Sequence, residues 1–357
     1  MLLRTLAALA ALAFLLPSCS KKSGSPTGLA PARTYCMGFS AIPPKPDLGV
    51  ALAALDLWTR RADAGVIVNE PPWDSLLAGR SPDSLIRADQ LGLANYFRAR
   101  GLRVVVSIDA TNGLDRAGES APLVVAGRSL TEPAIRQLYR AYVTAMDTLL
   151  HPDYLSVASE TNLIRLAAPP ALYAAVVQVA NDAAADVRAR AAAVRLLTTV
   201  QVEVAWGRQS PPGSFVGVDQ DRVDFPFIEA LGLSSYPYLG GFNEPEQLPL
   251  DYYSRLAETA PIPEMVIEGR WTSASVGGIT SSPEKQRRYL LRQAQILDRA
   301  GALYWFQITF TDLDLTAIPL PPGSILPLFA ALGLVDVNLA PKPALAAWDA
   351  AFARQHR

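Results

Sequence analysis

Carboxylate side chains stand at the ends of several apolar segments of this chain. Glu160 ends the segment 154–160, and Glu268 ends the segment 264–268. A third carboxylate, Glu203, lies between two valines. Burying an unpaired carboxylate is costly, so each of the three needs a partner or a chemical role. Two carboxyl groups held close together can divide the roles of nucleophile and general acid.

Further polar and aromatic residues lie at the ends of such segments. The polar ones are Asn69, Glu70, Asp109, Ser159, Asn162 and Asp312. Of these, Asn69, Glu70, Asp109 and Asp312 are each equally open to interpretation as a loop cap or a surface charge. The aromatic ones, each also compatible with ordinary core packing, are Trp73, Trp206, Tyr236, Tyr238, Trp271 and Trp305. Because aromatic rings beside carboxylates suit the flat C–H faces of sugar rings, the set predicts a carbohydrate-binding cleft.

Eight β-rich apolar segments alternate with helical patterns. We expect strands over 35–41, 65–69, 103–109, 154–160, 196–204, 230–236, 264–268 and 302–309. Helix starts are predicted at Thr131-Glu132-Pro133 and at Ser282-Pro283-Glu284, and 170–196 is a long Ala-rich helical stretch.

This alternation predicts an α/β protein with a parallel sheet, and the count of eight favours a closed (β/α)8 TIM barrel as a single domain over 34–357. An open doubly wound sheet is the alternative, although no glycine-rich phosphate motif follows the first strand. In a barrel the strand ends form one mouth, so we expect the polar and aromatic residues to meet there.

The two glutamates then carry a resemblance. Glu160 at the end of the fourth strand and Glu268 at the end of the seventh are similar to the catalytic pair of clan A glycoside hydrolases, which are retaining TIM-barrel enzymes. The segment Ser234-Ser235-Tyr236-Pro237-Tyr238 resembles that of the family 53 endo-β-1,4-galactanases in particular. The resemblance implies that Glu160 is the acid/base, that Glu268 is the nucleophile, and that Trp305 floors the site.

The expected function is therefore hydrolysis of a β-linked oligo- or polysaccharide with retention of configuration. Glu160 should then occupy a drier or more anionic environment than Glu268. Arg270, two residues from Glu268 on one face of an extended strand, is expected to keep Glu268 ionised. Ser159 stands where the clan has Asn, and Asn162 is the nearby amide.

Other interpretations stay open at this stage. Glu268 could form a structural pair with Arg270, Glu160 could cap a loop, and Glu203 could bind substrate or replace Glu160 as the partner. A catalytically silent carbohydrate-binding lipoprotein on the same barrel is the alternative function, and Ser159 is its main support. A transporter's solute-binding protein normally needs two lobes, whereas this chain shows one continuous alternation.

Composition excludes several other classes of function. The 32 Lys and Arg residues nearly balance 33 Asp and Glu residues, and no basic stripe is interleaved with aromatics, so we expect no nucleic-acid partner. With only two histidines, His-based zinc sites and Ser-His-Asp triads are hard to build, and we expect no metal and no cofactor. A carbohydrate is the expected ligand, and the protein is expected to be a monomer.

The N-terminus predicts export and lipidation. Residues 1–18 have the charge and short apolar run of a signal peptide, and Leu16-Pro17-Ser18-Cys19 resembles a bacterial lipobox. Residues 19–33 then form a polar tether, with Cys19 carrying the lipid as the only contact with the membrane. Ser20 favours sorting to the outer membrane in a cell that has one. If Cys19 is lipidated, Cys36 has no intramolecular disulfide partner.

The anchor can be tested by substitution. Cys19→Ala should abolish labelling by a radiolabelled fatty acid and release the protein from the membrane fraction, because no thiol remains at the cleavage point. Cys36→Ala is the matched control and should keep both the label and the membrane association. Unchanged labelling of Cys19→Ala would contradict the anchor.

Overall fold

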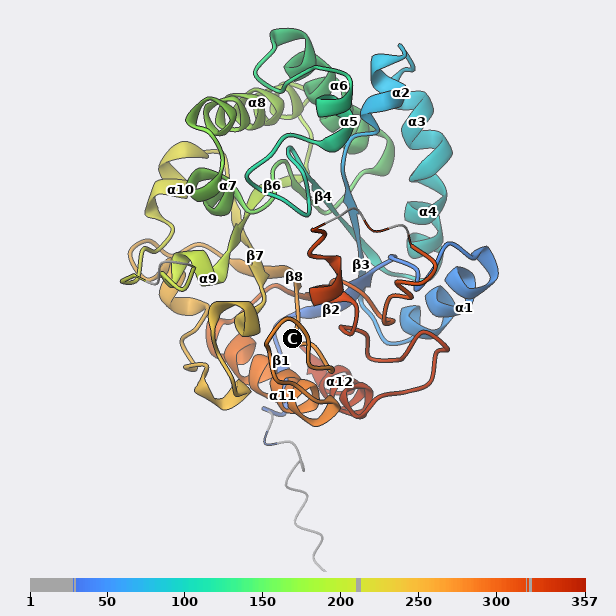
Figure 1. Ribbon diagram of the computed structural model, residues 1–357, viewed down its shortest axis with the longest axis vertical. Helices are drawn as coiled ribbons and strands as arrows, with labels where there is room; N and C mark the ends of the chain where they lie inside the picture. The colour runs from blue at the N-terminus through green and yellow to red at the C-terminus, as the bar shows by residue number, and fades with distance from the viewer. Residues whose placement is uncertain (1–27, 29, 210–212, 319, 321–322) are drawn as a thin grey trace, which may run out of the picture.

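The computed structural model describes residues 28, 30–209, 213–318, 320 and 323–357. The predicted signal peptide and Cys19 lie outside these residues. Eight parallel strands close into a barrel in chain order, with the helices ranged around it (Figure 1). The predicted (β/α)8 barrel is therefore confirmed, and the open sheet is excluded.

Each of the eight predicted strands is present, most of them with earlier ends than expected. Their bounds are β2 Cys36–Ser40, β3 Ala64–Asn69, β4 Arg103–Ile108, β5 Tyr154–Ser156, β6 Arg195–Gln201, β7 Ala230–Ser235, β8 Glu264–Gly269 and β9 Tyr304–Gln307. The largest differences are in β5, which ends four residues before Glu160, and in β6, which ends before Glu203.

Helices and 3-10 turns fill the connections. The α-helices are α1 Leu48–Thr59, α2 Trp73–Leu77, α3 Pro82–Asp89, α4 Leu91–Ala99, α5 Ala121–Val125, α6 Pro133–Leu150, α7 Thr161–Ala167, α8 Pro170–Ala189, α9 Val202–Ala205, α10 Asp219–Asp224, α11 Pro283–Ala300 and α12 Pro343–Phe352. The 3-10 turns are η1 Pro237–Gly240, η2 Pro245–Gln247, η3 Ser254–Ala257 and η4 Leu326–Phe329. Among the described residues, no helix is both long and apolar enough to cross a membrane.

Local signals explain two long helices. Ser282 caps α11 by accepting from the Lys285 N–H, and Gly301 ends it in the left-handed conformation, as the sequence predicts. The helix α6 begins at Pro133 as expected, but Glu132 rather than Thr131 is its N-cap residue. Pro at the first helical position loses no intrahelical hydrogen bond, which explains both starts.

The end of the predicted tether belongs to the folded domain. β1 Ala32–Arg33 pairs in parallel with β10 Gln355–His356 near the C-terminus. Arg33 is buried and forms an ion pair of 2.7 Å with Asp63. The folded domain therefore includes residues 32 and 33, which precede the predicted boundary at residue 34.

Two core layers follow from the alternation of side chains along the strands. One fills the barrel and includes Met265, Tyr304 and Phe306. The other lies between strands and helices and includes Val266 and Trp305. Successive residues of a strand point to opposite faces, so a shift of one position decides which layer a side chain enters.

A buried carboxyl at the start of β8 generates a stability prediction. Glu264 is 4% exposed, and neither carboxyl oxygen accepts a hydrogen bond from the part of the chain that the structure describes. Burial raises the pKa of Glu264 to about 8. The carboxyl group of Glu264 thus binds a proton more tightly in the folded state than in the unfolded state. The stabilisation that this proton gives to the folded state is lost as the pH rises from about 4.5 to about 8.

We therefore expect Glu264→Gln to gain stability relative to the parent protein as the pH rises from 5 to 8, by at most about 1.4 kcal/mol per pH unit. The measurement is urea denaturation at several pH values. Glu258→Gln, at an exposed position, is the control and should show no such pH-dependent gain. A difference between Glu264→Gln and the parent that is constant with pH would contradict the prediction.

Candidate active site

A cavity of about 540 Å³ opens at the carboxyl ends of the barrel strands. Every strand contributes to its wall, through Ile42 after β2, Val68 on β3, Asp109 after β4, Glu160 after β5, Gln201 on β6, Tyr236 after β7, Glu268 on β8 and Thr309 after β9. The cavity therefore brings together four of the predicted cleft residues, namely Asp109, Glu160, Tyr236 and Glu268.

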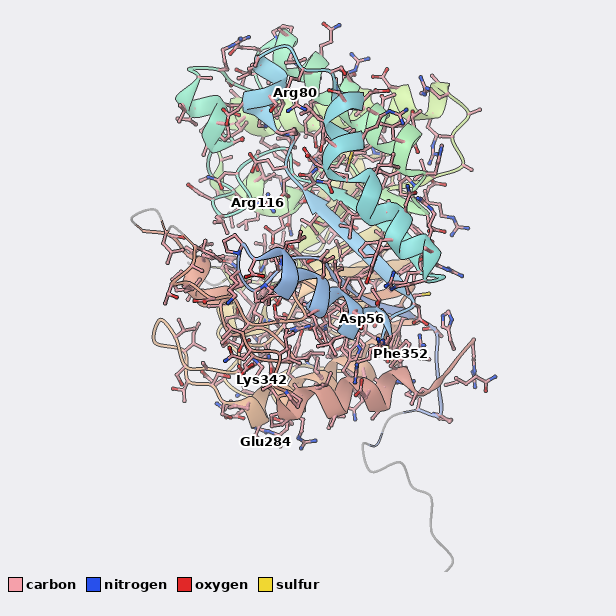
Figure 2. The ribbon with its side chains drawn as sticks, turned by 90° about the vertical axis from the view of Figure 1, so that its right-hand side faces the viewer. Asp56, Arg80, Arg116, Glu284, Lys342 and Phe352 are labelled. Carbon is pink, nitrogen blue, oxygen red and sulfur yellow. The ribbon has the colours of Figure 1, made fainter. Side chains whose placement is uncertain are left out.

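A buried arginine joins two of these carboxylates. Arg116 Nε donates to Glu160 Oε2 at 2.7 Å, and its Nη1 lies 3.0 Å from Asp109 Oδ1. Burial lowers the pKa of Arg116, but the charges of Asp109 and Glu160 outweigh this effect and raise it above its ordinary value. Arg116, in the loop after β4, is therefore a permanent cation at the base of the cavity. Figure 2 places it toward the left of the molecule and Phe352, in the last helix, toward the right.

Glu160 has a strained backbone. Its φ of 48° lies in the left-handed region, where a side chain costs roughly 1–2 kcal/mol. The Glu160 N–H donates to Thr199 Oγ1 at 2.7 Å, and Glu160 is the residue before α7. The expected strand end is thus a tight turn, which aims the carboxylate at Arg116 and Ser234. Strain of this kind gathers at functional sites.

A β-bulge aims Glu268 into the cavity. Leu233 pairs with Val266 and Ser234 pairs with Glu268, so Ile267 is an extra residue in β8. Without the bulge, Glu268 would share the outward direction of Val266. Gly269 completes the turn with a φ of 140°, and a Cβ there would lie 2.2 Å from the Ser235 carbonyl oxygen.

One hydroxyl lies between the two catalytic candidates. Ser234 Oγ is 2.7 Å from Glu160 Oε1 and 2.8 Å from Glu268 Oε1. The two carboxyl oxygens are therefore at most the sum of these distances, 5.5 Å, apart. A hydroxyl has one hydrogen to donate, so satisfying both contacts requires a proton on one carboxyl group.

Glu268 is the favoured carrier of this proton. Burial, and then the charge of Glu160, raise the pKa of Glu268 to about 8. Glu160 instead pairs with Arg116. Glu160 is the drier of the two groups, as expected, since it is buried where Glu268 is half-buried, but its nearest charge is a cation rather than an anion.

Arg270 is not the partner of Glu268. It is fully buried and donates to Gln307 Oε1 and to the Leu332 carbonyl oxygen. Burial lowers its pKa to about 9. The expectation failed because the bulge and the turn at Gly269 end the alternation that would put both side chains on one face. A structural Glu268–Arg270 pair is excluded for the same reason.

Glu203 lies behind the cavity wall. It is fully buried in α9 and accepts hydrogen bonds from Gln201 Nε2 at 2.6 Å, Tyr252 OH at 2.8 Å and the Tyr236 N–H at 3.1 Å. Burial raises its pKa to about 7. Glu203 does not line the cavity; it fixes the backbone of Tyr236, which does.

The other polar candidates have partners outside the cavity. The side-chain amide of Asn162 donates to the Gln201 carbonyl oxygen and accepts from the Gln201 N–H. Ser159 Oγ lies 3.2 Å from Ser107 Oγ. Among the remaining ones, Asn69 donates to Tyr142 OH and Glu70 accepts from Ser120. Asp312 forms an ion pair with Lys342. Asn162 is therefore not a substitute for the Asn that Ser159 replaces.

Five of the six aromatic candidates do not face the cavity. Trp73, Trp271 and Trp305 are fully buried in the layer between strands and helices. Trp305 Nε1 donates to Gln293 on α11, because the strand alternation turns Tyr304 and Phe306 inward instead. The other two are Tyr238, which donates to Leu328, and Trp206, which stacks on Tyr252 beside a separate hollow. Only Tyr236 lies at the cavity, so the predicted aromatic platform, including a Trp305 floor, is wrong.

Sequence reasoning missed Arg116, Ser234 and Gln201. Ser234 lies within the segment singled out for its tyrosines, and its position two residues before Tyr236 implies the same strand face. Arg116 offers only a weak signal, as a lone basic residue in the loop that follows Asp109. Its contact with Glu160 spans 44 residues of sequence, which no local pattern reports.

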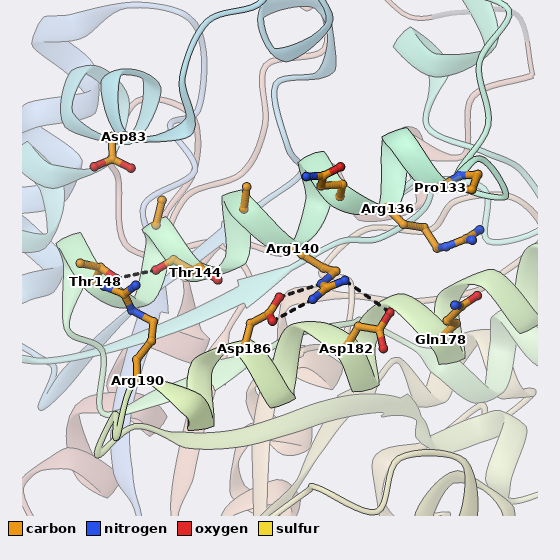
Figure 3. Close-up of a pocket in the computed structure, with 13 residues that line it drawn as sticks. Asp83, Pro133, Arg136, Arg140, Thr144, Thr148, Gln178, Asp182, Asp186 and Arg190 are labelled. Atoms are coloured by element: carbon orange, nitrogen blue, oxygen red, sulfur yellow. Dashed lines mark hydrogen bonds and ion pairs between the residues drawn. The ribbon is translucent and has the colours of Figure 1, made fainter.

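A larger hollow of about 690 Å³ lies on the outside of the barrel between α6 and α8 (Figure 3). Three of its charged residues are paired with each other: Arg140 binds Asp186 at 2.7 Å and lies 3.8 Å from Asp182. These side chains are about one-third exposed, so the groove has the character of a solvated helix surface rather than a reactive site.

Comparisons with known proteins support the fold. No protein-family model and no curated protein matches the chain. Among solved structures, an exo-β-1,4-mannosidase from Opitutaceae bacterium strain TAV5 has a TM-score of 0.65 at 17% identity, over 92% of this chain and 62% of the mannosidase. This chain thus spans less than two thirds of that protein.

Two further structural neighbours have the same barrel. The GH5_18 protein from Streptomyces cattleya, in complex with GlcNAc, has a TM-score of 0.61 at 18% identity, over 91% of this chain and 83% of its own. A β-D-glucuronidase from Dictyoglomus thermophilum has a TM-score of 0.59 at 10% identity, over 90% of this chain and 51% of the glucuronidase. At these identities the likeness establishes the fold.

The role of Arg116 predicts a large difference between two arginine variants. Arg116→Met leaves Asp109 and Glu160 buried without their cation and should cost about 3–5 kcal/mol of unfolding free energy at pH 7. Arg140→Met, at the exposed ion pair of α6, should cost less than about 1 kcal/mol. Urea denaturation measures both. Equal losses would contradict the assignment of Arg116 as the cation of the carboxylate cluster.

Proposed function

We propose that this protein is a retaining hydrolase of β-glycosides, with Glu160 as acid/base and Glu268 as nucleophile. The observation that carries the proposal is the carboxyl pair at the barrel mouth, whose oxygens lie at most 5.5 Å apart across Ser234. Retaining pairs are about 5–5.5 Å apart, and inverting pairs are about 6.5–9.5 Å apart. The β-glycosidase names of the structural neighbours are consistent with this proposal.

The proton on Glu268 must move before Glu268 can attack. Ser234 Oγ contacts one oxygen of each glutamate, so it can pass a proton from Glu268 to Glu160 without a change of backbone. Glu268 then attacks the anomeric carbon as a carboxylate, and Glu160 protonates the leaving oxygen. Water activated by Glu160 releases the sugar in the second step.

The protein is proposed to be exported and anchored to a bacterial membrane through a lipid on Cys19. Family 53 galactanase activity remains the narrower proposal from the Ser234–Tyr238 segment, so β-1,4-galactan belongs in the substrate screen. The alternative function, a silent carbohydrate binder, draws support from the Glu160–Arg116 ion pair, because the pairing occupies one oxygen of the carboxyl group that is proposed as the acid/base.

The test uses a soluble form that begins at residue 28 and a panel of aryl β-glycosides, with β-1,4-galactan added as a substrate for the parent protein. Glu268→Gln should lower turnover by about 10⁴-fold or more, because the nucleophile is lost. Glu160→Ala should form the glycosyl-enzyme from an aryl glycoside and then stall, and added azide should restore turnover with a glycosyl azide of retained configuration. Glu258→Ala, at an exposed position, should match the parent.

Each alternative gives a different result. A retained azide product from the Glu268 variant, instead of the Glu160 variant, would exchange the two roles. Parent rates in both variants would remove the pair from the mechanism. Sugar binding by the parent without hydrolysis of any substrate in the panel would establish the silent binder, and Ser159→Asn would then be the first change to make.

A further inference from the structure

The cavity wall above the carboxylates is mainly apolar. Of the nineteen described residues that line the cavity, eleven have aliphatic or aromatic side chains: Ile42, Val68, Leu114, Leu163, Tyr236, Leu239, Ile308, Leu313, Ile325, Leu326 and Phe329. Tyr236 and Phe329, the two aromatic ones, pack edge to face at 5.0 Å rather than side by side as stacking surfaces. None of the six tryptophans lines the cavity.

The polar lining is small and much of it is already engaged. Asp109 and Glu160 are each bound to Arg116, and Glu268 shares Ser234 with Glu160. The side chains of Gln201 and Thr309 already have partners in the protein, and Gln209 is the other polar side chain of the lining. A chain of sugars carries hydroxyl groups on every ring, and each buried hydroxyl needs a hydrogen-bonding partner. These polar groups suit a single ring better than a row of several rings along the aliphatic wall.

Large aliphatic side chains also project into solvent at the mouth. Ile42, Leu114 and Ile325 are 38%, 44% and 41% exposed. They come from three separate connections, after β2, after β4 and after β9, yet line the same cavity. Exposed apolar residues that gather around a cleft mark a binding surface for an apolar group, since leaving them in water has a free-energy cost.

One wall of this surface is formed by Ile325, Leu326 and Phe329. Ile325 is the residue before η4, and the other two belong to η4. The wall is held to the barrel: the Leu313 N–H donates to the Ala330 carbonyl oxygen at 2.8 Å, and Tyr238 OH donates to the Leu328 carbonyl oxygen at 3.0 Å. The apolar surface is thus built before a ligand arrives and faces the same space as Glu160 and Glu268.

We propose that the substrate is a β-glycoside whose aglycone is an aliphatic group, such as an alkyl chain, rather than a polysaccharide. This inference rests on the proposed glycosidase function. The single sugar ring lies against Glu160 and Glu268, and the aglycone lies between η4 and the loop that carries Leu114. Hydrolysis places the proton of Glu160 on the aglycone oxygen, which leaves as an alcohol, and water supplies the hydroxyl group that the sugar gains.

The experiment measures binding and hydrolysis separately. Methyl, hexyl and octyl β-glycosides of glucose, mannose and galactose, all below their micelle concentrations, are titrated calorimetrically into Glu268→Gln and hydrolysed by the parent. We expect Kd to fall by about three- to four-fold for each methylene group that enters the cavity. Tetrasaccharides of the same β-linked sugars should bind less tightly than the octyl glycosides.

A double variant at the rim of the cavity and a control variant test whether the rim binds the alkyl chain. Leu114→Asn combined with Ile325→Asn should raise Kd for the octyl glycoside at least ten-fold and leave the methyl glycoside unchanged. Leu52→Asn, at a 50% exposed position on α1, is the matched control and should change neither. Since all three positions are exposed, the variants are expected to fold.

The outcomes separate this inference from the proposed function. If Kd is independent of chain length, or if the tetrasaccharides bind more tightly, the aliphatic aglycone is overturned even where the parent hydrolyses glycosides. If the chain-length dependence and the rim effect are present but the parent hydrolyses nothing, the ligand class is supported and the hydrolase is overturned.

Discussion

The site depends on one buried cation among three carboxyl groups. Two unit charges of the same sign 5.5 Å apart repel by roughly 3 kcal/mol at an effective dielectric constant of 20. Arg116 pairs with Asp109 and Glu160, whereas Glu268 has no ion pair among the described residues. Burial and the charge of Glu160 raise the pKa of Glu268 to about 8, so a proton on one of the two groups relieves their repulsion. The proposed acid/base roles need two carboxyl groups that differ in this way.

The barrel stabilises this arrangement because each charged group is held by a different part of the barrel. Arg116 comes from the loop after β4, Glu160 from a left-handed turn, and Glu268 from a bulged strand. Each departure from regular structure has a free-energy cost, and the closed sheet holds it in place because the neighbouring strands cannot slip. Glu203 adds a second layer, since its hydrogen bonds fix Tyr236 and Gln201 at the cavity wall.

The same mouth combines this charged base with an aliphatic wall. An apolar wall lowers the local dielectric constant and thereby strengthens the interactions among Arg116, Glu160 and Glu268. Sugar hydroxyl groups find few partners on the apolar side chains of this wall. Under the proposed function and ligand class, the base would take one sugar ring and the wall would take the apolar group joined to it.

The sequence by itself determined the eight strands and the helix starts at Pro133 and Pro283. These features follow from local composition, capping and the order of elements, which a linear pattern contains. The resemblance to clan A glycoside hydrolases predicted that Glu160 and Glu268 form a pair, and the structure brings both into contact with Ser234. Only the tertiary structure decided which side chains face the cavity. One extra residue in β8 turned Glu268 inward and Arg270 away, and the two-residue period turned Trp305 outward. Arg116 reaches Glu160 across 44 residues, and the location of the proton follows from burial and from that contact. Neither is a property of any short segment, because both arise from charges that folding brings together.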